Sequence, residues 1–170
     1  SSTGLPVGDI QISGGNIHVT CSGQQDGSEG IESKGTLTIS GGTIDCNTYD
    51  DAINSSSHMY IKGGTITVYS SGNDGLDSNG SIFLSGGTVY VNGPVSDGDG
   101  ALDYNGGADI TGGTIIAVGS SGMAQGFSDS SAQCSILHNL TNTQEAQTAV
   151  TLQDEDGKEL LSFTPKKKYS

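Results

Sequence analysis

Apolar and polar residues alternate in short runs along most of the chain, and a Gly-Gly pair interrupts the runs at regular intervals. The pairs begin at Gly14, Gly41, Gly63, Gly86 and Gly112. Alternation with a period of two is typical of a strand with one buried face, so each copy predicts a strand, a kink at the glycines and a second strand. A period of 22 to 27 residues is typical of a solenoid built from stacked units.

The apolar residues of the five copies fall into matched columns when the copies are aligned on Gly-Gly. In the first copy the inward residues are Ile10, Ile12, Ile17 and Val19, and the later copies repeat these four positions. A further column follows in the turn after each copy: Ile31, Ile53, Leu76, Leu102 and Met123. Three strand positions per unit predict an all-β, right-handed parallel β-helix of about five or more coils.

The C-terminal part lacks the Gly-Gly period, so we expect β-helix coils over residues 1–135 and a capping segment over 136–170. Residues 149–164 alternate on both sides of Asp156-Gly157, which predicts a β-hairpin. We expect this hairpin to cover an edge or an open end of the stack, and to lie on a patch formed by Tyr90, Ile116 and Val118. The ending TPKKKYS predicts an element that is truncated at Ser170.

Composition narrows the range of partners. The chain has 19 acidic residues and 6 basic ones, all of them Lys, and its net charge is −13. Binding to nucleic acid needs a basic surface, so we expect no nucleic-acid partner. No run of about 18 apolar residues occurs, so we expect no membrane insertion. The odd count of three cysteines (Cys21, Cys46 and Cys134) favours free thiols over a disulfide framework.

Acidic residues form columns in the turns of the predicted coils. Alignment on the apolar residue stacks Glu32, Asn54, Asp77, Asp103 and Ala124, with Asp51 and Asp74 in a second column. Coils lie about 4.8 Å apart, so the carboxylates of neighbouring coils repel each other unless a cation lies between them. Oxygen ligands favour Ca²⁺. The expected ligands are Asp74, Asp77, Asp99 and Asp103, with Asp51 and Asn54 as further candidates.

The same residues have a simpler explanation. Asp, Asn and Gly are the residues that tight turns select, because they tolerate left-handed dihedrals and form hydrogen bonds with their own backbone. The sequence leaves turn chemistry and a bound cation as equal alternatives.

Outward aromatic side chains form a second group of candidates. Tyr60 and Phe83 occupy one column before Gly-Gly, while Tyr69 and Tyr90 lie diagonally after it. Exposed aromatic rings on a flat sheet suit the apolar face of a sugar ring. We therefore predict carbohydrate binding by Tyr60, Phe83, Tyr69 and Tyr90, with Tyr60 and Phe83 as the freer pair.

Residues 73–136 resemble the bacterial carbohydrate-binding domain-containing β-helix proteins through LDSNG, GGTVYVNGP, GALDY and GSSGMAQ together. A looser resemblance extends over residues 9–168. The resemblance implies a secreted or cell-surface right-handed β-helix similar to pectate lyases, which contains calcium and binds cellulose and acidic polysaccharides. The motif residues that it carries over to this chain are Asp77, Asp103 and Met123-Ala124-Gln125.

Two other functions compete with non-catalytic polysaccharide binding. A polysaccharide lyase needs a strong base, commonly Arg, and the chain has no Arg; Lys34 and Lys62 lie outside the acidic columns of the sequence alignment. A structural surface protein, such as an adhesin or a filament subunit, would associate through the exposed ends of the stack as a homo-oligomer. We expect a non-enzyme and keep both alternatives open.

Overall fold

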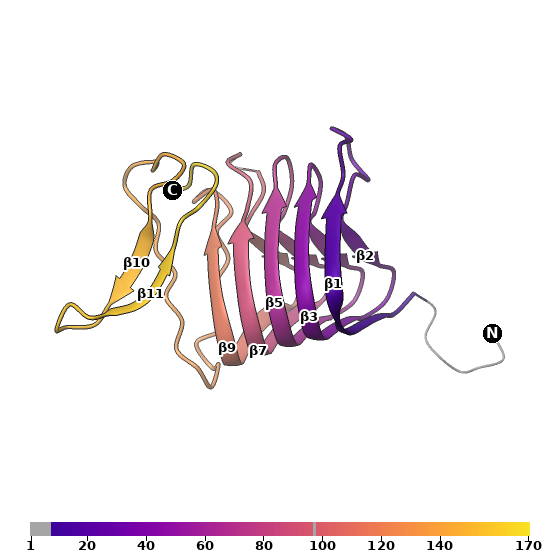
Figure 1. Cartoon of the computed structure of the whole chain (residues 1–170), viewed down its shortest axis with the longest axis horizontal. Helices are drawn as coiled ribbons and strands as arrows, with labels where there is room; N and C mark the ends of the chain where they lie inside the picture. Colours follow the sequence, from indigo (N-terminus) through magenta and orange to yellow (C-terminus); the bar gives the residue numbers. More distant parts are fainter. Residues whose placement is uncertain (1–7, 97) are drawn as a thin grey trace.

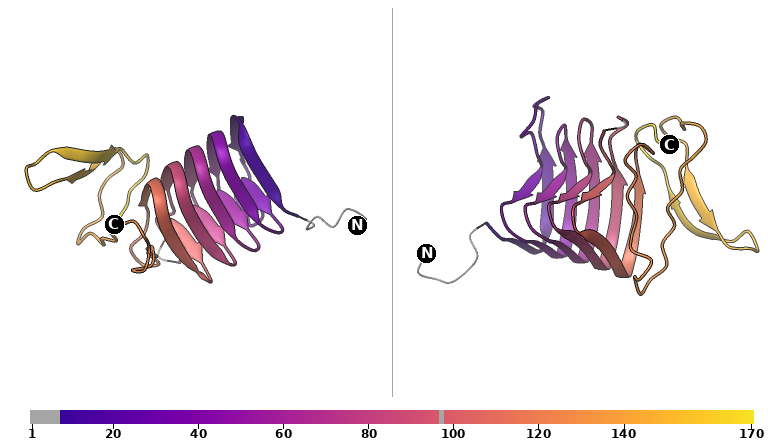
Figure 2. Two further views of the ribbon diagram at one scale, coloured as in Figure 1. Left: turned by 90° about the horizontal axis from the view of Figure 1, so that it is seen from below. Right: turned by 180° about the vertical axis from the view of Figure 1, so that it is seen from behind.

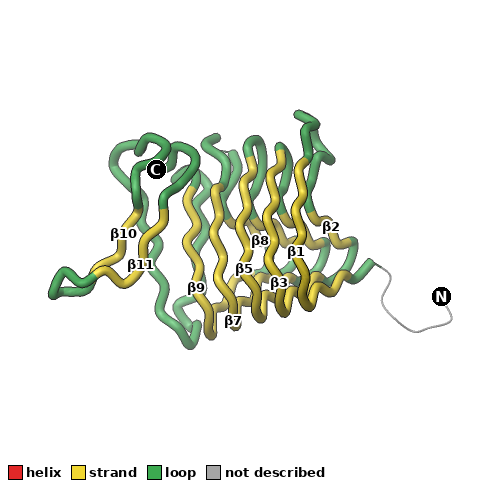
Figure 3. Tube along the Cα trace, in the orientation of Figure 1, coloured by secondary structure: helices red, strands yellow, loops and turns green. Residues whose placement is uncertain are grey.

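A computed structural model describes residues 8–96 and 98–170 of the chain (Figure 1). The solenoid is a parallel β-stack of about five turns, confirming the predicted all-β solenoid. The described residues include no helix, and therefore none that could cross a membrane (Figure 3).

Each of the first four coils consists of one long strand followed by one short strand, and within the described residues the fifth coil has a long strand without a short strand after it. The long strands form a sheet in the order β1 (Ile10–Thr20), β3 (Leu37–Thr48), β5 (Met59–Ser70), β7 (Ser81–Asn92) and β9 (Gly107–Val118). The short strands form a second sheet in the order β2 (Ile31–Ser33), β4 (Ile53–Ser55), β6 (Leu76–Ser78) and β8 (Leu102–Tyr104). The two predicted strands on either side of Gly-Gly are thus halves of one strand, which the glycines interrupt with a shift of register.

The apolar columns form the core, as the sequence predicts. The register pairs Ile12 with Ile39, Ile39 with Ile61, Ile61 with Leu84, and Leu84 with Ile110. The short strands repeat the pattern with Ile31, Ile53, Leu76 and Leu102. The inward apolar residues of β3, β5 and β7 are 0 to 1% exposed. At roughly 25 cal/mol per Å² of apolar area, these columns supply the main stabilisation of the stack.

Serine hydroxyls occupy one corner of the core. Ser33, Ser55 and Ser78 are all fully buried, and they share one column. The single hydroxyl proton of Ser55 is shared between the carbonyls of Gly35, at 2.9 Å, and of His58, at 3.0 Å, so this residue joins two neighbouring coils. The next position in the column is Tyr104, whose hydroxyl donates to the carbonyl of Gly126.

The predicted fifth member of the short-strand column is wrong. Residues 121–125 form a turn and no strand, and the Met123 side chain is 45% exposed. The Gln125 side chain occupies this end of the sheet instead, since its Oε1 accepts a hydrogen bond from the backbone N–H of Tyr104 at 2.9 Å. Ala124 therefore does not extend the acidic column.

The C-terminal segment contains the predicted hairpin, formed by β10 (Val150–Gln153) and β11 (Glu159–Phe163). The hairpin lies beyond β9 at one end of the stack (Figure 2). Its residues pack on the outer face of the long-strand sheet, where Tyr90, Ile116 and Val118 form a separate apolar cluster with Phe163 and Tyr169. The backbone edge of β9 is covered by the loop at 128–133, through bonds such as Ser128 N–H to Ala108 C=O at 2.8 Å. The boundary at residue 135 stays a prediction.

We predict that the second glycine of a Gly-Gly pair tolerates alanine only at the exposed end of the stack. Gly15 and Gly87 share a left-handed conformation, with φ of 92° and 88°. A Cβ on Gly87 would lie 2.8 Å from backbone atoms of Gly63 and Gly64, whereas one on Gly15 meets nothing within 4 Å. Gly15→Ala should cost about 1–2 kcal/mol of unfolding free energy through strain alone, and Gly87→Ala about 1–3 kcal/mol more. Denaturant unfolding measures both, and equal losses would contradict the close approach of the coils.

Candidate functional site

The short-strand sheet carries the acidic column on its outer face. The register pairs Glu32 with Asn54, Asn54 with Asp77, and Asp77 with Asp103, as the sequence predicts. Each residue directly follows an inward apolar residue, so the alternation of the strand turns its side chain outward. The column therefore presents one oxygen-bearing side chain per coil.

Three carboxylates converge at the β8 end of this face. Asp74, Asp77 and Asp103 each offer an oxygen, and these oxygens all lie within 4.8 Å of one another. Asp77 and Asp103 come from adjacent strands β6 and β8, whereas Asp74 comes from the turn before β6. Three acidic oxygens at this separation form the kind of set that a hard divalent cation binds.

Two of the predicted acidic ligands also accept hydrogen bonds from the backbone. Asp51 Oδ1 accepts the N–H of Asp74 at 3.0 Å, and Asp74 Oδ1 accepts the N–H of Gly100 at 2.6 Å. Each carboxylate thereby braces its own coil to the next. Asp50 also joins two coils, in the adjoining turn, where its Oδ1 accepts a hydrogen bond from the side-chain amide of Asn73 at 2.7 Å. Turn chemistry and the convergence of carboxylates thus occur side by side.

Asp99 and Asn54 lie at the margins of the cluster. Asp99 accepts a hydrogen bond from the hydroxyl of Ser96 at 2.6 Å and is not one of the three converging carboxylates. Asn54 donates to Asp51 Oδ2 at 3.0 Å. The Oδ1 of Asn54 is buried without a hydrogen-bond partner, as is the Oε2 of Glu29. Glu29 was missed in the sequence because it lies outside the repeated alignment.

Burial makes the carboxylates of this region hard to ionise. Desolvation, followed by repulsion from Asp77 and Asp74, raises the pKa of Asp51 to about 8. Desolvation also raises the pKa of Asp74 to about 7, although the Gly100 hydrogen bond opposes the rise. The pKa of Asp77 rises to about 6 through desolvation and the nearby Asp103. A cation at this position would relieve a repulsion that the fold itself creates.

Lys34 lies beside the acidic column of the short-strand sheet, and Lys62 does not. The amine of Lys34 forms an ion pair with Glu32, which contradicts the expectation that Lys34 lies outside the acidic columns. Lys62 is exposed on the other sheet, with its Nζ 5.4 Å from the centre of the Tyr60 ring. Among the described residues, the three converging carboxylates therefore have no lysine as an ion-pair partner.

The aromatic candidates separate into three environments. Tyr60 and Phe83 stack on each other with their centres 4.9 Å apart and their planes inclined by 11°. The two facing surfaces cover each other, and the His58 ring lies beside both, with its centre 6.3 Å from that of Tyr60 and 6.0 Å from that of Phe83. Tyr90 lies under the hairpin, stacked on Phe163 at 5.2 Å. Tyr69 lies apart from both groups, at the far end of β5 beside the C-terminal residues.

The three cysteines are free, as the sequence predicts. Cys46 is buried in an inward column, Cys21 is half-buried, and Cys134 is exposed. The Sγ of Cys21 donates to the carbonyl of Glu29 at 2.9 Å. Desolvation raises the pKa of Cys46 to about 12, which keeps this thiol protonated and unreactive.

We predict that the metal-free protein loses stability as the pH rises from about 4 to 8. The folded-state pKa values of about 6 to 8 exceed the ordinary Asp value of 3.8, so the folded protein holds extra protons in this window. The resulting stabilisation is complete below pH 4 and is lost as the pH rises through the folded-state values. In chelator, the melting temperature should fall by about 5 °C between pH 4.5 and 8.

Asp74→Asn should flatten this profile, because the amide keeps an acceptor oxygen for Gly100 but carries no charge. Asp129→Asn, at an exposed loop position, is the matched control and should leave the slope unchanged. A melting temperature that rises with pH in chelator would show that these carboxylates are ionised without cost.

Comparison with known proteins gives one finding. No curated protein and no solved structure matches the chain. Residues 6–75 match a family model described as carbohydrate-binding domain-containing protein. This segment includes all of β1 to β5, whereas the motifs that suggested the same family from the sequence lie in residues 73–136. The match therefore confirms the resemblance to a carbohydrate-binding domain family over the first coils of the solenoid.

Proposed function

We propose that this protein binds polysaccharide without cleaving it. The observation that carries the proposal is the family match over residues 6–75, which coincides with intact coils of the solenoid. The parallel stack supports it, because neighbouring strands repeat outward side chains at a spacing of about 4.8 Å along a flat face. A linear polymer can lie along such a face and contact several coils. We place this function outside the cell, on the protein's secreted or surface-bound form.

The chemistry of the acidic side chains favours binding over catalysis. The chain has no Arg to act as a strong base, and the Lys34 amine is paired with Glu32. Asp51 and Asp74 accept backbone N–H groups and brace the coils. Pairs of carboxylates arise from the repeat itself, so their spacing is not a sign of glycoside hydrolysis.

We further propose that Asp74, Asp77 and Asp103 hold Ca²⁺. Their convergent oxygens fit a hard cation. In the neighbouring coils, one oxygen of Asn54 and one of Glu29 are buried without a hydrogen-bond partner among the described residues, so positive charge is lacking there too. Calcium bound here would supply positive charge to an acidic face. The net charge of −13 repels uronate-containing polymers, and a bound cation would let their carboxylates approach.

The proposal is tested by pulling the protein down with insoluble polysaccharides in calcium and in chelator. Acidic polymers such as polygalacturonate should bind in calcium and fail to bind in EDTA. Neutral polymers such as cellulose should bind in both conditions. Release of an unsaturated sugar that absorbs in the ultraviolet would show a lyase, and absence of binding to every polymer would overturn the proposal.

We predict that calcium stabilises the fold through the three converging carboxylates. A ligand that binds only the folded state adds about 2.7 kcal/mol at 100 times its dissociation constant, so the melting temperature should rise by about 5–10 °C. EDTA should remove the gain. Differential scanning calorimetry with and without calcium measures this difference.

Asp103→Asn should reduce the calcium response, because it removes one of the converging charges without changing the shape of the side chain. Asp129→Asn should respond as the unmodified protein does. Equal calcium responses in all three proteins would place the ion elsewhere, and a melting curve insensitive to both calcium and EDTA would leave turn chemistry alone.

A further inference from the structure

The C-terminal residues divide the outer face of the long-strand sheet into a covered and an open half. Ile116, Val118 and Tyr169 form a buried cluster beneath the hairpin, over β7 and β9. The outer residues of β1, β3 and β5 lie beyond this cover. The boundary between the two halves runs beside β5, where the chain's last residues are seated.

Hydrogen bonds fix the last residues at this boundary. The backbone N–H of Lys166 donates to Asn92 Oδ1 at 2.9 Å, and the backbone N–H of Ser170 donates to the carbonyl of Gly119 at 2.9 Å. The Lys167 amine is buried and donates to the carbonyls of Ser70 and, at 2.6 Å, of Gly93. The segment is thus attached to the ends of β5, β7 and β9.

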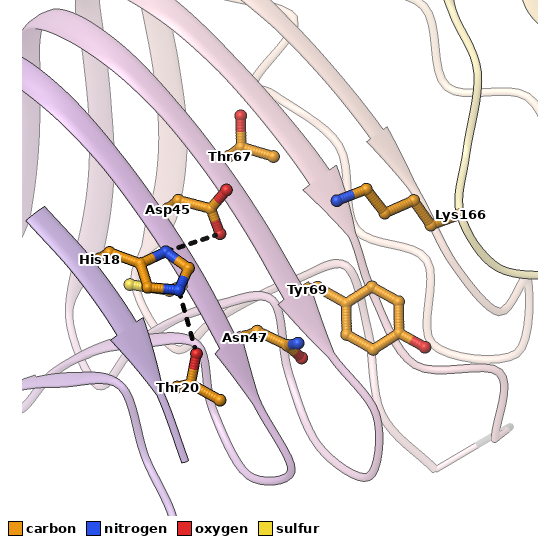
Figure 4. A pocket seen from close by; sticks show the side chains of 8 residues that line it. His18, Thr20, Asp45, Asn47, Thr67, Tyr69 and Lys166 are labelled. Carbon is orange, nitrogen blue, oxygen red and sulfur yellow. Dashed lines mark hydrogen bonds and ion pairs between the residues drawn. The ribbon is translucent and has the colours of Figure 1, made fainter. Parts of the chain in front are cut away.

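A groove of about 260 Å³ lies at the boundary. Its floor consists of two rows of outward side chains that the register places on three adjacent strands (Figure 4). The rows are His18, Asp45 and Thr67, and then Thr20, Asn47 and Tyr69. Lys166 forms the wall, and Figure 4 shows its amine extending over the floor from the covered side.

The polar groups of the groove are available to a ligand. Asp45 is half-exposed, and among residues 8–96 and 98–170 its side chain pairs with His18 alone, at 3.8 Å. Within the part of the chain that the structure describes, neither the Asn47 side chain nor the Lys166 amine has a hydrogen-bond or ion-pair partner. In the described part of the chain, an amide and an ammonium group without a partner therefore face the same space as a carboxylate that is paired on one side with His18.

Tyr69 supplies the apolar surface of the groove. Its ring lies 5.0 Å from the amine of Lys167, which is itself held by two backbone carbonyls. The cation over the ring fixes the tyrosine in place before any ligand arrives. A fixed aromatic ring beside a few convergent polar groups is the usual composition of a small-molecule site.

We propose that this groove is the subsite that binds one neutral pyranose unit of a polysaccharide. The ring of Tyr69 packs against the apolar face of the sugar, Asp45 and Asn47 bind its hydroxyls, and the Lys166 amine donates to a hydroxyl from the side. The whole floor, from His18 to Tyr69, lies inside the segment that matches the carbohydrate-binding family. The inference rests on the proposed function and gives it a location.

Charge favours a neutral sugar over an acidic one. The floor carries the Asp45 carboxylate, and the chain as a whole carries a net charge of −13. A uronate carboxylate in the groove would gain Lys166 but would face Asp45 and the long-range field of the protein. Hydroxyls of a neutral sugar can accept from Lys166 and donate to Asp45 at the same time.

The test is native affinity electrophoresis in a soluble neutral β-glucan, hydroxyethyl cellulose, with EDTA present throughout. Lys166→Met and Asn47→Ala should each weaken binding of the glucan about tenfold, because each substitution removes a side chain that forms a hydrogen bond with the sugar. Lys158→Met, in the hairpin turn, removes the same charge far from the groove and should bind as the unmodified protein does. Melting temperatures establish that the variants remain folded.

The outcomes separate the two proposals. If the unmodified protein binds the glucan and both groove variants bind it within twofold as well, the proposed subsite is wrong, whereas polysaccharide binding by the protein is supported. If polygalacturonate competes better than the neutral glucan in EDTA, the groove takes an acidic sugar and the inference is wrong. If the unmodified protein binds neither polymer, with or without calcium, both proposals fail.

Discussion

In-register parallel stacking is the constraint on which this molecule depends. Each long strand pairs with the next through equivalent residues, from Ile12 with Ile39 to Leu84 with Ile110. A residue type that recurs in the sequence therefore becomes a column in space, with members about 4.8 Å apart. Columns of Ile and Val gain from this proximity through burial, and columns of carboxylates are destabilised by it.

The polar columns show how the fold accommodates this constraint. Buried Ser55 shares its hydroxyl proton between backbone carbonyls of two coils, and Asp51 and Asp74 accept N–H groups of the following coil. These contacts turn polar residues into cross-coil braces. The braces that accept N–H groups also concentrate negative charge, since Asp51 and Asp74 are carboxylates. The raised pKa values of Asp51, Asp74 and Asp77 are the electrostatic consequence of a geometry that first serves the backbone.

The repeat explains why most of the fold could be predicted from the sequence. Period-two alternation assigns Ile61 to the interior and Tyr60 to the surface, and the Gly-Gly pairs set the register between coils. The prediction for Met123 and Ala124 was wrong because Gln125 ends the sheet with a side-chain hydrogen bond that alignment on the apolar residue does not reveal.

The repeat also explains which residues of the candidate site could be predicted from the sequence. The column of Asp77 and Asp103 follows from the repeat, and so does the stacking of Tyr60 on Phe83, because equivalent positions on adjacent coils must lie close together. Asp99 could not be placed, because its turn lies outside the strands that carry the register. Glu29 was missed for the same reason.

The groove depends on a part of the chain that the repeat does not control. A regular stack presents the same surface at every coil, and a flat surface of that kind has no position that a single sugar could occupy in preference to the next. The C-terminal segment removes this equivalence, because Lys167 and Ser170 attach it to the ends of β5, β7 and β9 and leave Tyr69 at the boundary. Lys166 then meets Asp45 and Asn47, which lie more than a hundred residues earlier in the chain. The solenoid supplies the floor and the tail supplies the wall, so position along the stack is defined only where the two meet.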